Sequence, residues 1–222
     1  MPQNITDAFQ KVDSSDSEFL IQFLVDANRI PSVLESFRSQ LDLLGIRQGD
    51  QVLDIGCGIG ERAAQMGELV GPTGKVVGTD ISEVMVAASK QSYGESDLPL
   101  EFHVADACRQ PFPDRSFDRI RTERVLMYVD DLAAAFSEFR RLLKDGGKLL
   151  VVDFAWDSLI FGNRDKALTR RITHYVCDSF PNGRVGADLY RLFHNFGFEG
   201  VTATPIGYQC SLEFTKRVLA GC

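Results

Sequence analysis

One short stretch, from Gln51 to Arg62, constrains the fold of this chain more than any other part of its sequence. It begins as an apolar run typical of a buried strand, continues through glycines at positions 56, 58 and 60, and leads directly into a helix-forming segment. Glycine adopts positive φ without strain and lets a ligand approach the backbone, and a helix N-terminus offers unpaired N–H groups. The stretch therefore predicts a strand, a tight turn and a helix that together bind a nucleotide-like ligand.

The spacing of these glycines indicates which nucleotide is bound. A dinucleotide fingerprint reads Gly-x-Gly-x-x-Gly, and its third glycine allows close packing of helix on strand. Here the pattern is Gly-x-Gly-x-Gly, and Glu61 stands where that third glycine would fall. Asp54 also places a carboxylate just before the turn, which would repel a pyrophosphate but attract an ammonium and a sulfonium group. The motif therefore favours S-adenosylmethionine over NAD.

After this motif, strand-like and helix-like segments alternate along the chain. Strands are expected at 51–55, 75–79, 100–104, 117–121 and 148–154, and a late strand at 200–208. Helices are expected at 18–28, 32–44, 60–70, 82–92, 131–144, 163–180 and 184–196. Such alternation predicts an α/β fold in which a doubly wound, mostly parallel sheet carries helices on both faces.

The length of 222 residues and the hydrophobic content of 44% favour a single domain, 1–222, with one good-sized core. Within it, residues 1–45 are expected to form an N-terminal helical cover and residues 46–155 the cofactor-binding core. Residues 156–222 are expected to supply the substrate-side helices and the last strand.

The run Val52–Gly60 resembles the first motif of class I S-adenosylmethionine-dependent methyltransferases. Two later segments, Pro111–Asp118 and Arg141–Lys148, are similar to segments of the ubiquinone/menaquinone biosynthesis methyltransferases and related small-molecule enzymes, with Asp145 where proline is usual. Together the motifs cover about residues 50–155. The resemblance implies an enzyme that binds S-adenosyl-L-methionine and releases S-adenosyl-L-homocysteine.

The same resemblance implies a Rossmann-like sheet with the strand order 3-2-1-4-5-(7)-6, in which the seventh strand is antiparallel. After Gly207, however, the sequence contains only the helical-looking segment 211–220, so either the last strand is missing or the sheet ends differently. A missing strand would expose a sheet edge, which invites pairing with another molecule. A homodimer through the C-terminal edge is therefore a hypothesis.

Two acids stand out as cofactor ligands because each follows a predicted strand. Asp80 is expected to accept hydrogen bonds from both ribose hydroxyls, and the resemblance implies that Asp106 holds the adenine amino group. The alternatives are a helix cap for Asp80 and an ordinary turn for Asp106. The full set expected around the cofactor is Asp54, Gly56, Cys57, Gly58, Gly60, Asp80, Ile81, Met85, Asp106, Ala107 and Thr122.

No motif identifies a catalytic base. The reaction would be an in-line displacement of the sulfonium methyl, in which alignment contributes most and a base helps where the nucleophile loses a proton. Candidate bases are Glu123, Tyr128 and His174, with His194 weaker. Tyr128, Trp156 and His174 are expected to line the acceptor pocket. A solvated helix face for His174 and plain core packing for Trp156 remain equally compatible with the sequence.

Composition limits the function classes. A net charge of −7 disfavours binding to a nucleic-acid backbone, and three histidines without ligand-like spacing disfavour a metal site. Five scattered cysteines, no signal-like N-terminus and no long apolar run favour a cytoplasmic protein.

The leading expectation is methyl transfer to an O, N or C atom of a small organic metabolite. The alternatives are an RNA- or protein-modifying methyltransferase, or a non-catalytic S-adenosylmethionine-binding partner subunit. A dehydrogenase is disfavoured by the glycine spacing.

Overall fold

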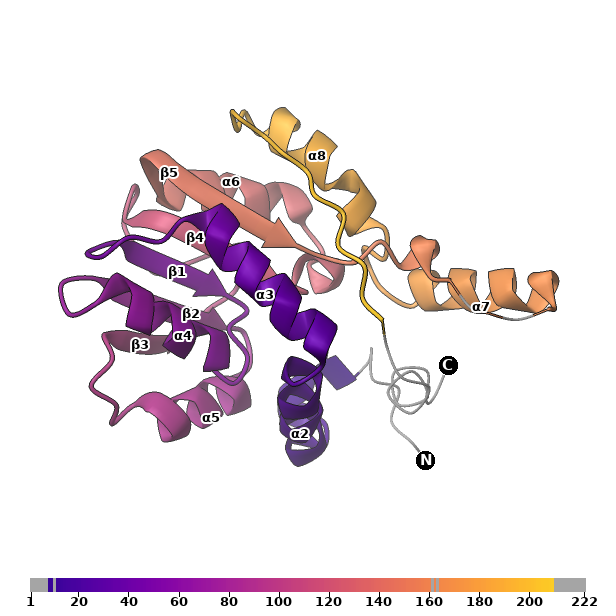
Figure 1. The fold of residues 1–222 in the computed structure, drawn as a ribbon, viewed down its shortest axis with the longest axis horizontal. Helices are drawn as coiled ribbons and strands as arrows, with labels where there is room; N and C mark the ends of the chain where they lie inside the picture. Colours follow the sequence, from indigo (N-terminus) through magenta and orange to yellow (C-terminus); the bar gives the residue numbers. More distant parts are fainter. Residues whose placement is uncertain (1–7, 10, 161, 163, 210–222) are drawn as a thin grey trace.

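A computed structural model describes residues 8, 9, 11–160, 162 and 164–209, and a parallel sheet lies at its centre (Figure 1). Its strands are β1 (Gln51–Ile55), β2 (Lys75–Asp80), β3 (Leu100–Val104), β4 (Phe117–Glu123) and β5 (Leu143–Val152). They lie in the order β3-β2-β1-β4-β5, and every neighbouring pair is parallel. The predicted α/β class, the parallel sheet and its order through the fifth strand are confirmed.

Helices cover both faces of this sheet. The α-helices are α2 (Ser17–Asn28), α3 (Pro31–Leu44), α4 (Glu61–Val70), α5 (Glu83–Tyr93), α6 (Leu132–Leu142), α7 (Lys166–Asp178) and α8 (Val185–Asn195). Three short 3₁₀ turns are η1 (Val12–Ser14), η2 (Leu126–Tyr128) and η3 (Trp156–Ser158). In the described part of the chain, every helix is too short or too polar to span a bilayer.

Strand periodicity divides the apolar side chains between two cores. Successive side chains of a strand point to opposite faces, so Val52 joins one core and Leu53 the other. The core around Val52 is closed by α3, α4 and α5, and includes Phe37, Leu44, Ala63, Met66, Val70 and Val86. The core around Leu53 is closed by α6 and α8.

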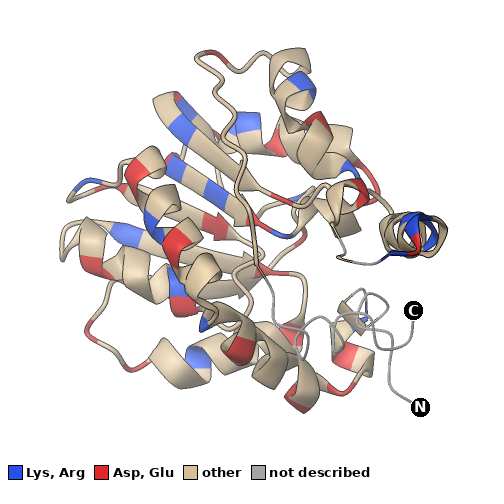
Figure 2. Ribbon diagram, turned by 45° about the vertical axis from the view of Figure 1, so that its right-hand side comes forward, with Lys and Arg blue, Asp and Glu red and all other residues tan. Residues whose placement is uncertain are grey.

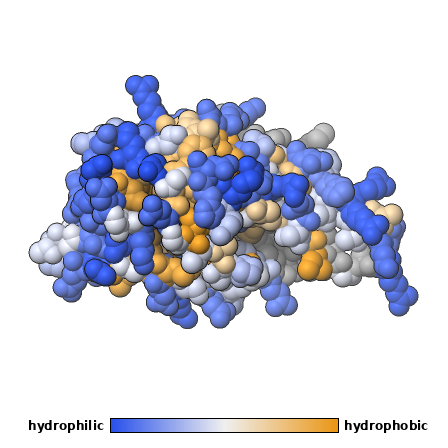
Figure 3. Space-filling model, turned by 90° about the horizontal axis from the view of Figure 1, so that it is seen from above, coloured by the Kyte–Doolittle hydropathy of each residue, from blue (hydrophilic) through white to orange (hydrophobic). Residues whose placement is uncertain are grey.

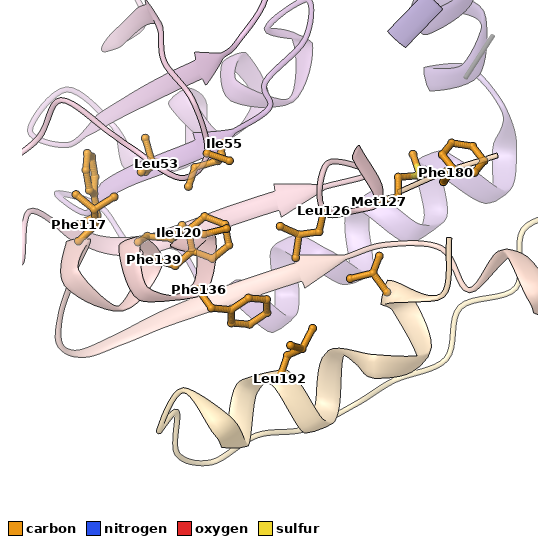
Figure 4. Close-up of a cluster of buried hydrophobic side chains, with 14 of the residues drawn as sticks. Leu53, Ile55, Phe117, Ile120, Leu126, Met127, Phe136, Phe139, Phe180 and Leu192 are labelled. Carbon is orange, nitrogen blue, oxygen red and sulfur yellow. The ribbon is translucent and has the colours of Figure 1, made fainter. Parts of the chain in front are cut away.

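Phe136 connects α6 to the C-terminal part of the domain. Its side chain is fully buried and points toward Leu192 of α8 (Figure 4). Its ring centroid lies 5.4 Å from that of Phe193, 5.5 Å from Phe196 and 6.3 Å from Phe198. Aromatic packing of this kind fixes α8 against the sheet, which positions the segment that follows α8.

The late strand expected at 200–208 is wrong, because these residues form no strand. Pro205 lacks the N–H that a ladder needs, and Gly207 adds no side chain to pack. The segment instead runs past the end of β5 and to the right of α3 in the view of Figure 1, and Tyr208 Oη lies 2.9 Å from Ser36 Oγ of α3. In the described residues β5 is therefore an edge strand, and the expected helix at 211–220 lies outside them.

The fifth strand also differs from its expected bounds. It runs from Leu143 to Val152, and it begins before the expected start at residue 148 because it includes a bulge. Phe117 pairs with Leu143, but Arg119 pairs with Lys148, so extra residues of β5 loop out between these pairs. The strand ends just before Asp153.

On the side of the molecule seen in Figure 3, hydrophobic residues are exposed between polar ones.

We expect Phe136→Ala to lower the free energy of unfolding by about 3–5 kcal/mol, because it removes a fully buried ring from five-ring packing. Leu69→Ala is the control, since Leu69 of α4 is 43% exposed, and it should change stability by about 0.5 kcal/mol or less. Urea unfolding of both variants measures the difference. Similar losses in the two variants would contradict the role assigned to Phe136.

Candidate functional site

A cavity of about 2470 Å³ opens where the carboxyl ends of the parallel strands meet. Ligands of doubly wound folds bind at this edge of the sheet. The cavity contacts the glycine turn after β1 and the segments that follow β2, β3, β4 and β5, and it continues along β5 to the segment 197–208. Since single small-ligand sites measure roughly 300–1,000 Å³, the space can hold more than one ligand.

The glycine turn is built as its sequence predicts. Gly56, Gly58 and Gly60 have φ values of 72°, 53° and 77°. The N–H groups of Gly56 and Cys57 both donate to Thr79 O, at 2.7 and 2.9 Å, so the turn is fixed to β2. A Cβ on Gly56 would lie 2.1 Å from Cγ2 of Val125, so only glycine lets the segment after β4 pack against the turn.

Asp80 is held by backbone groups on both sides. Its Oδ2 accepts the Gly58 N–H at 2.9 Å, and its Oδ1 accepts the Ser82 N–H at 3.0 Å. Burial raises the pKa of this carboxyl, and the two N–H groups oppose that rise. Ser82, whose Oγ accepts the Met85 N–H, is the cap of α5. Each oxygen of Asp80 keeps a lone pair for a ligand hydroxyl.

Asp54 lies in a buried ion-pair network and not free in the cavity. Its side chain is fully buried, and its Oδ1 accepts from Arg121 Nη1 at 2.8 Å. Arg121 also pairs with Glu123, and burial raises the pKa of Asp54 against the effect of Arg121. Arg121 therefore offsets much of the charge that was expected to repel a pyrophosphate. Oδ2 of Asp54 has no hydrogen-bond partner among the described residues.

The other expected cofactor residues surround the same space. Asp106 lies just after β3, and its Oδ1 accepts the Cys108 N–H at 2.8 Å. Ile81 is 67% exposed at the cavity mouth, whereas Met85 and Ala107 are buried. The full expected set lines the cavity except Gly60 and Thr122. Gly60 serves instead as the N-cap of α4, and Thr122 is buried within β4.

An aromatic cluster forms one wall of the cavity. Trp156 stacks on Phe180 with centroids 5.0 Å apart, and it lies 4.5 Å from Phe154. Tyr128 lies 5.5 Å from Phe180. The structure thus places Tyr128 and Trp156, two residues expected to line the acceptor pocket, in the same cavity wall.

The structure does not bring the candidate histidines to this wall. His174 lies on the exposed face of α7, outside the cavity lining formed by the described residues. His194 packs against Tyr190 on α8, with ring centroids 4.6 Å apart. Glu123 does line the cavity but is buried against Arg121, and the charges of Arg124 and Arg121 outweigh burial to lower its pKa.

Two acids at this site escaped the sequence analysis. Asp153 lines the cavity just after β5, and its Oδ2 accepts the Leu126 and Met127 N–H groups at 2.8 and 3.3 Å. Burial raises the pKa of Asp153 to about 7. Asp13 of η1 lies outside the cavity lining and accepts the Glu83 N–H at 3.1 Å, which fastens η1 to α5. Asp153 follows the observed strand β5, but the sequence analysis places it inside the strand expected at 148–154, so the rule that singled out Asp80 passed over it.

Gly56→Ala and Gly146→Ala form a matched pair, because both glycines have φ near +73°, at +72° and +74°. In both variants the free energy of unfolding should fall by roughly 1–2 kcal/mol, because alanine is strained in the left-handed conformation. Only Gly56→Ala also collides with Val125, whereas nothing lies within 4 Å of a Cβ on Gly146. We therefore expect urea unfolding to show a larger loss of stability in Gly56→Ala than in Gly146→Ala. Adding Val125→Ala to Gly56→Ala should restore part of that stability. Equal losses would contradict the close packing described above.

Comparison with known proteins agrees with this geometry. Residues 53–151 match the family model described as a methyltransferase domain. An uncharacterized 37.1 kDa protein of a Streptomyces fradiae transposon is 38% identical over 174 residues, which are 77% of this chain and 50% of that protein. A ubiquinone/menaquinone biosynthesis C-methyltransferase of Pseudomonas putida is 39% identical over 120 residues, 53% of this chain and 47% of that enzyme.

A solved structure shares the fold. Phosphoethanolamine N-methyltransferase 2 of Haemonchus contortus, in complex with phosphomonomethylethanolamine and S-adenosylhomocysteine, superposes with a TM-score of 0.60 at 26% identity. The match covers 75% of this chain and 37% of that chain, and this chain spans about half the length of the curated relatives it matches. From fold, glycine turn and sequence similarity together, we conclude that the chain carries a class I S-adenosylmethionine-dependent methyltransferase domain, similar to that of the ubiquinone/menaquinone biosynthesis methyltransferases.

Proposed function

We propose that this protein transfers the methyl group of S-adenosylmethionine to an O, N or C atom of a small organic acceptor. The observation that carries the proposal is that one cavity joins the glycine turn, with Asp80 beside it, to a wall of aromatic side chains. Cofactor and acceptor could therefore meet inside a single space. Such a meeting is what methyl transfer requires, because much of its acceleration comes from alignment of the reacting atoms.

The residues present suit the cofactor. Absence of side chains at Gly56 and Gly58 leaves the backbone open to a ligand, and the spare lone pairs of Asp80 suit two ribose hydroxyls. Asp106 and the backbone of Ala107 would hold the adenine ring. When bound, S-adenosylmethionine supplies a methyl group already activated by the sulfonium charge. The protein then needs to bind the cofactor and the acceptor, to orient them toward each other and to exclude water.

The acceptor side favours a small organic molecule over a nucleic acid. Aromatic faces of Tyr128, Phe154 and Trp156 offer apolar contact to a planar or alkyl acceptor. Acids such as Asp130 and Asp131 line the same space and would repel a phosphate backbone. Lysines and arginines line the cavity as well, and α7, which extends away from the sheet, carries Lys166, Arg170 and Arg171 (Figures 1 and 2).

Asp153 is the side chain best placed to accept a proton from an acceptor. It lines the cavity beside the aromatic wall, and a carboxyl that titrates near pH 7 is suited to proton transfer at neutral pH. Tyr128 is less suited, since burial raises the pKa of its hydroxyl well above the usual value and keeps it protonated. A homodimer through the C-terminal edge of the sheet stays a prediction, which light scattering tests.

Methyl transfer from labelled S-adenosylmethionine to a panel of phenols, quinols, amines and indoles tests the proposal directly. Labelled product with at least one small acceptor, and none with RNA or protein, is the expected result. Cofactor binding without transfer to any acceptor would favour the non-catalytic alternative, and salt-sensitive labelling of RNA would favour the modifying enzyme.

We expect Asp80→Ala to weaken S-adenosylmethionine binding by about 10-fold or more, because charge-assisted hydrogen bonds are worth roughly 1.5–3 kcal/mol. Asp97→Ala, at an exposed acid between α5 and β3, is the control and should leave the affinity unchanged. Isothermal calorimetry measures both. Unchanged affinity in Asp80→Ala would remove Asp80 from the cofactor site.

Once an acceptor is identified, the rate of methyl transfer should rise as the pH increases through about 7, because Asp153 accepts a proton only when it is ionised. Asp153→Asn should slow transfer by about 100-fold and abolish this rise. The asparagine oxygen can still accept the Leu126 and Met127 N–H groups, but its amide nitrogen cannot accept the Phe154 N–H that Asp153 Oδ1 accepts at 2.9 Å, so thermal unfolding should verify that the variant is folded.

Asp157→Asn is the control, since Asp157 pairs with Arg184 at 2.7 Å on the nearby η3. It should keep the wild-type pH profile. A profile with the same rise in Asp153→Asn would exclude Asp153 as the proton acceptor.

A further inference from the structure

The helix α7 projects from the body of the domain (Figures 1 and 2). Its buried side chains, Thr173, Val176 and Cys177, all belong to its C-terminal half, and α7 packs beside η3. Among the described residues, no member of the preceding stretch 166–172 is buried. A helix of this length is marginal without packing, because most helical stability in proteins comes from burial of one face. The unburied half of α7 therefore points to a partner beyond the described residues.

An apolar stripe runs along the exposed side of α7. Leu168, Ile172 and Tyr175 are spaced four and three residues apart, which places them on one face of the helix. Leu168 is 40% and Tyr175 is 52% exposed, whereas Ile172 is half-buried. Ile160, which precedes α7 and lines the cavity, is 95% exposed. Apolar side chains that are grouped in water mark an interaction surface, whereas single ones need no explanation.

A basic face lies beside this apolar stripe. It consists of Lys166 and Arg170, which lie about one turn apart, and of Arg171, which lies between them and the stripe around the helix. Within the described residues, none of the three side chains has an ion pair or a hydrogen bond. The stretch 166–175 contains these three basic residues and no acid, so its net charge is +3, although the chain as a whole carries −7.

An apolar stripe beside a basic face is the pattern of helices that lie in the interface of a membrane. The apolar side chains enter the boundary between headgroups and acyl chains, and the basic side chains are attracted to anionic lipid. A tyrosine ring, as at Tyr175, is suited to the headgroup level. An RNA would match the charges of the basic face, but the aliphatic side chains of the stripe would gain nothing from its phosphates.

The acidic body of the domain does not prevent such a contact. Because α7 projects from the sheet, a surface that touches α7 lies closer to the basic face than to most of the domain (Figure 2). Salt screens exposed charges that are separated by more than about 10 Å. The local charge of the helix can therefore decide which surface binds.

We infer that α7 docks the protein on an anionic membrane surface, with its apolar stripe in the headgroup region and its basic face on the lipid phosphates. A short stripe gives a reversible anchor, so that binding needs both the apolar contact and the charges. This surface role goes beyond the methyl transfer proposed above and does not depend on it, so the two can fail separately.

Co-sedimentation of the full chain with lipid vesicles tests the inference. Vesicles of phosphatidylcholine and phosphatidylglycerol in equal parts should bind the protein at least about 10-fold more tightly than vesicles of phosphatidylcholine alone. The double variant Arg170→Gln, Arg171→Gln should bind the mixed vesicles about 30-fold more weakly, because each basic residue contributes to the attraction. The double variant Leu168→Ser, Tyr175→Ser should weaken binding by about 10-fold or more and keep the preference for phosphatidylglycerol.

The double variant Arg47→Gln, Lys90→Gln is the matched control. It also removes two exposed basic residues, but from the segment before β1 and from α5, which lie far from α7 in Figure 1. It should bind the mixed vesicles as the wild type does. Thermal unfolding verifies that each variant is folded, and calorimetric binding of S-adenosylhomocysteine should be the same in all of them, which separates lipid binding from the cofactor site.

Wild-type binding to neither kind of vesicle, or equal binding to both, would overturn the inference. Unchanged vesicle binding by Arg170→Gln, Arg171→Gln would overturn it as well. A single-stranded RNA that binds α7 where vesicles do not would favour the RNA-modifying alternative instead. A mass in light scattering that falls on these substitutions, without any vesicle binding, would assign the surface to a second copy of the chain.

Discussion

The ion pairs of Arg121 are the interaction on which the site depends. Asp54 of β1 and Arg121 of β4 are direct partners in the parallel pairing, so their side chains meet at the same level of the sheet. Glu123 joins them from two residues further along β4. Removing one member of a buried pair costs roughly 3–5 kcal/mol, because it leaves an uncompensated charge. The network therefore fixes the register of the two strands whose ends carry the glycine turn and Arg124.

The position of the cavity follows from this pairing of β1 with β4 and from the parallel direction of the strands. Parallel strands end at one edge, and the segments after them supply Asp80, Asp106 and Asp153 to a common space. The turn at Gly56 lets Val125 approach closely, which brings the segment after β4 against the cofactor side. The aromatic cluster around Trp156 forms the opposite wall. The glycine turn, the acids and the aromatic wall thus meet in one cavity as a consequence of one sheet topology.

Local features of this fold were readable from the sequence. The glycine turn and the position of Asp80 each depend on residues that are neighbours in the chain, whereas the order of the first five strands was implied by the resemblance to a known family. The pairing of Asp54 with Arg121 was not readable, because it joins residues 67 positions apart and depends on strand register. The conformation of Arg124 was not readable either, since positive φ is enforced by packing and not by residue type. The late strand failed for a similar reason, because an apolar segment becomes a strand only where a partner strand accepts it.

The account stands on the claim that an adenosyl ligand binds over the glycine turn. A crystal structure of the protein with S-adenosylhomocysteine measures this most directly. We predict density for the adenosyl group beside Gly56 and Gly58, with both ribose hydroxyls within hydrogen-bond distance of Asp80. Density for the ligand elsewhere in the cavity, with Asp80 still bonded only to backbone N–H groups, would contradict the account.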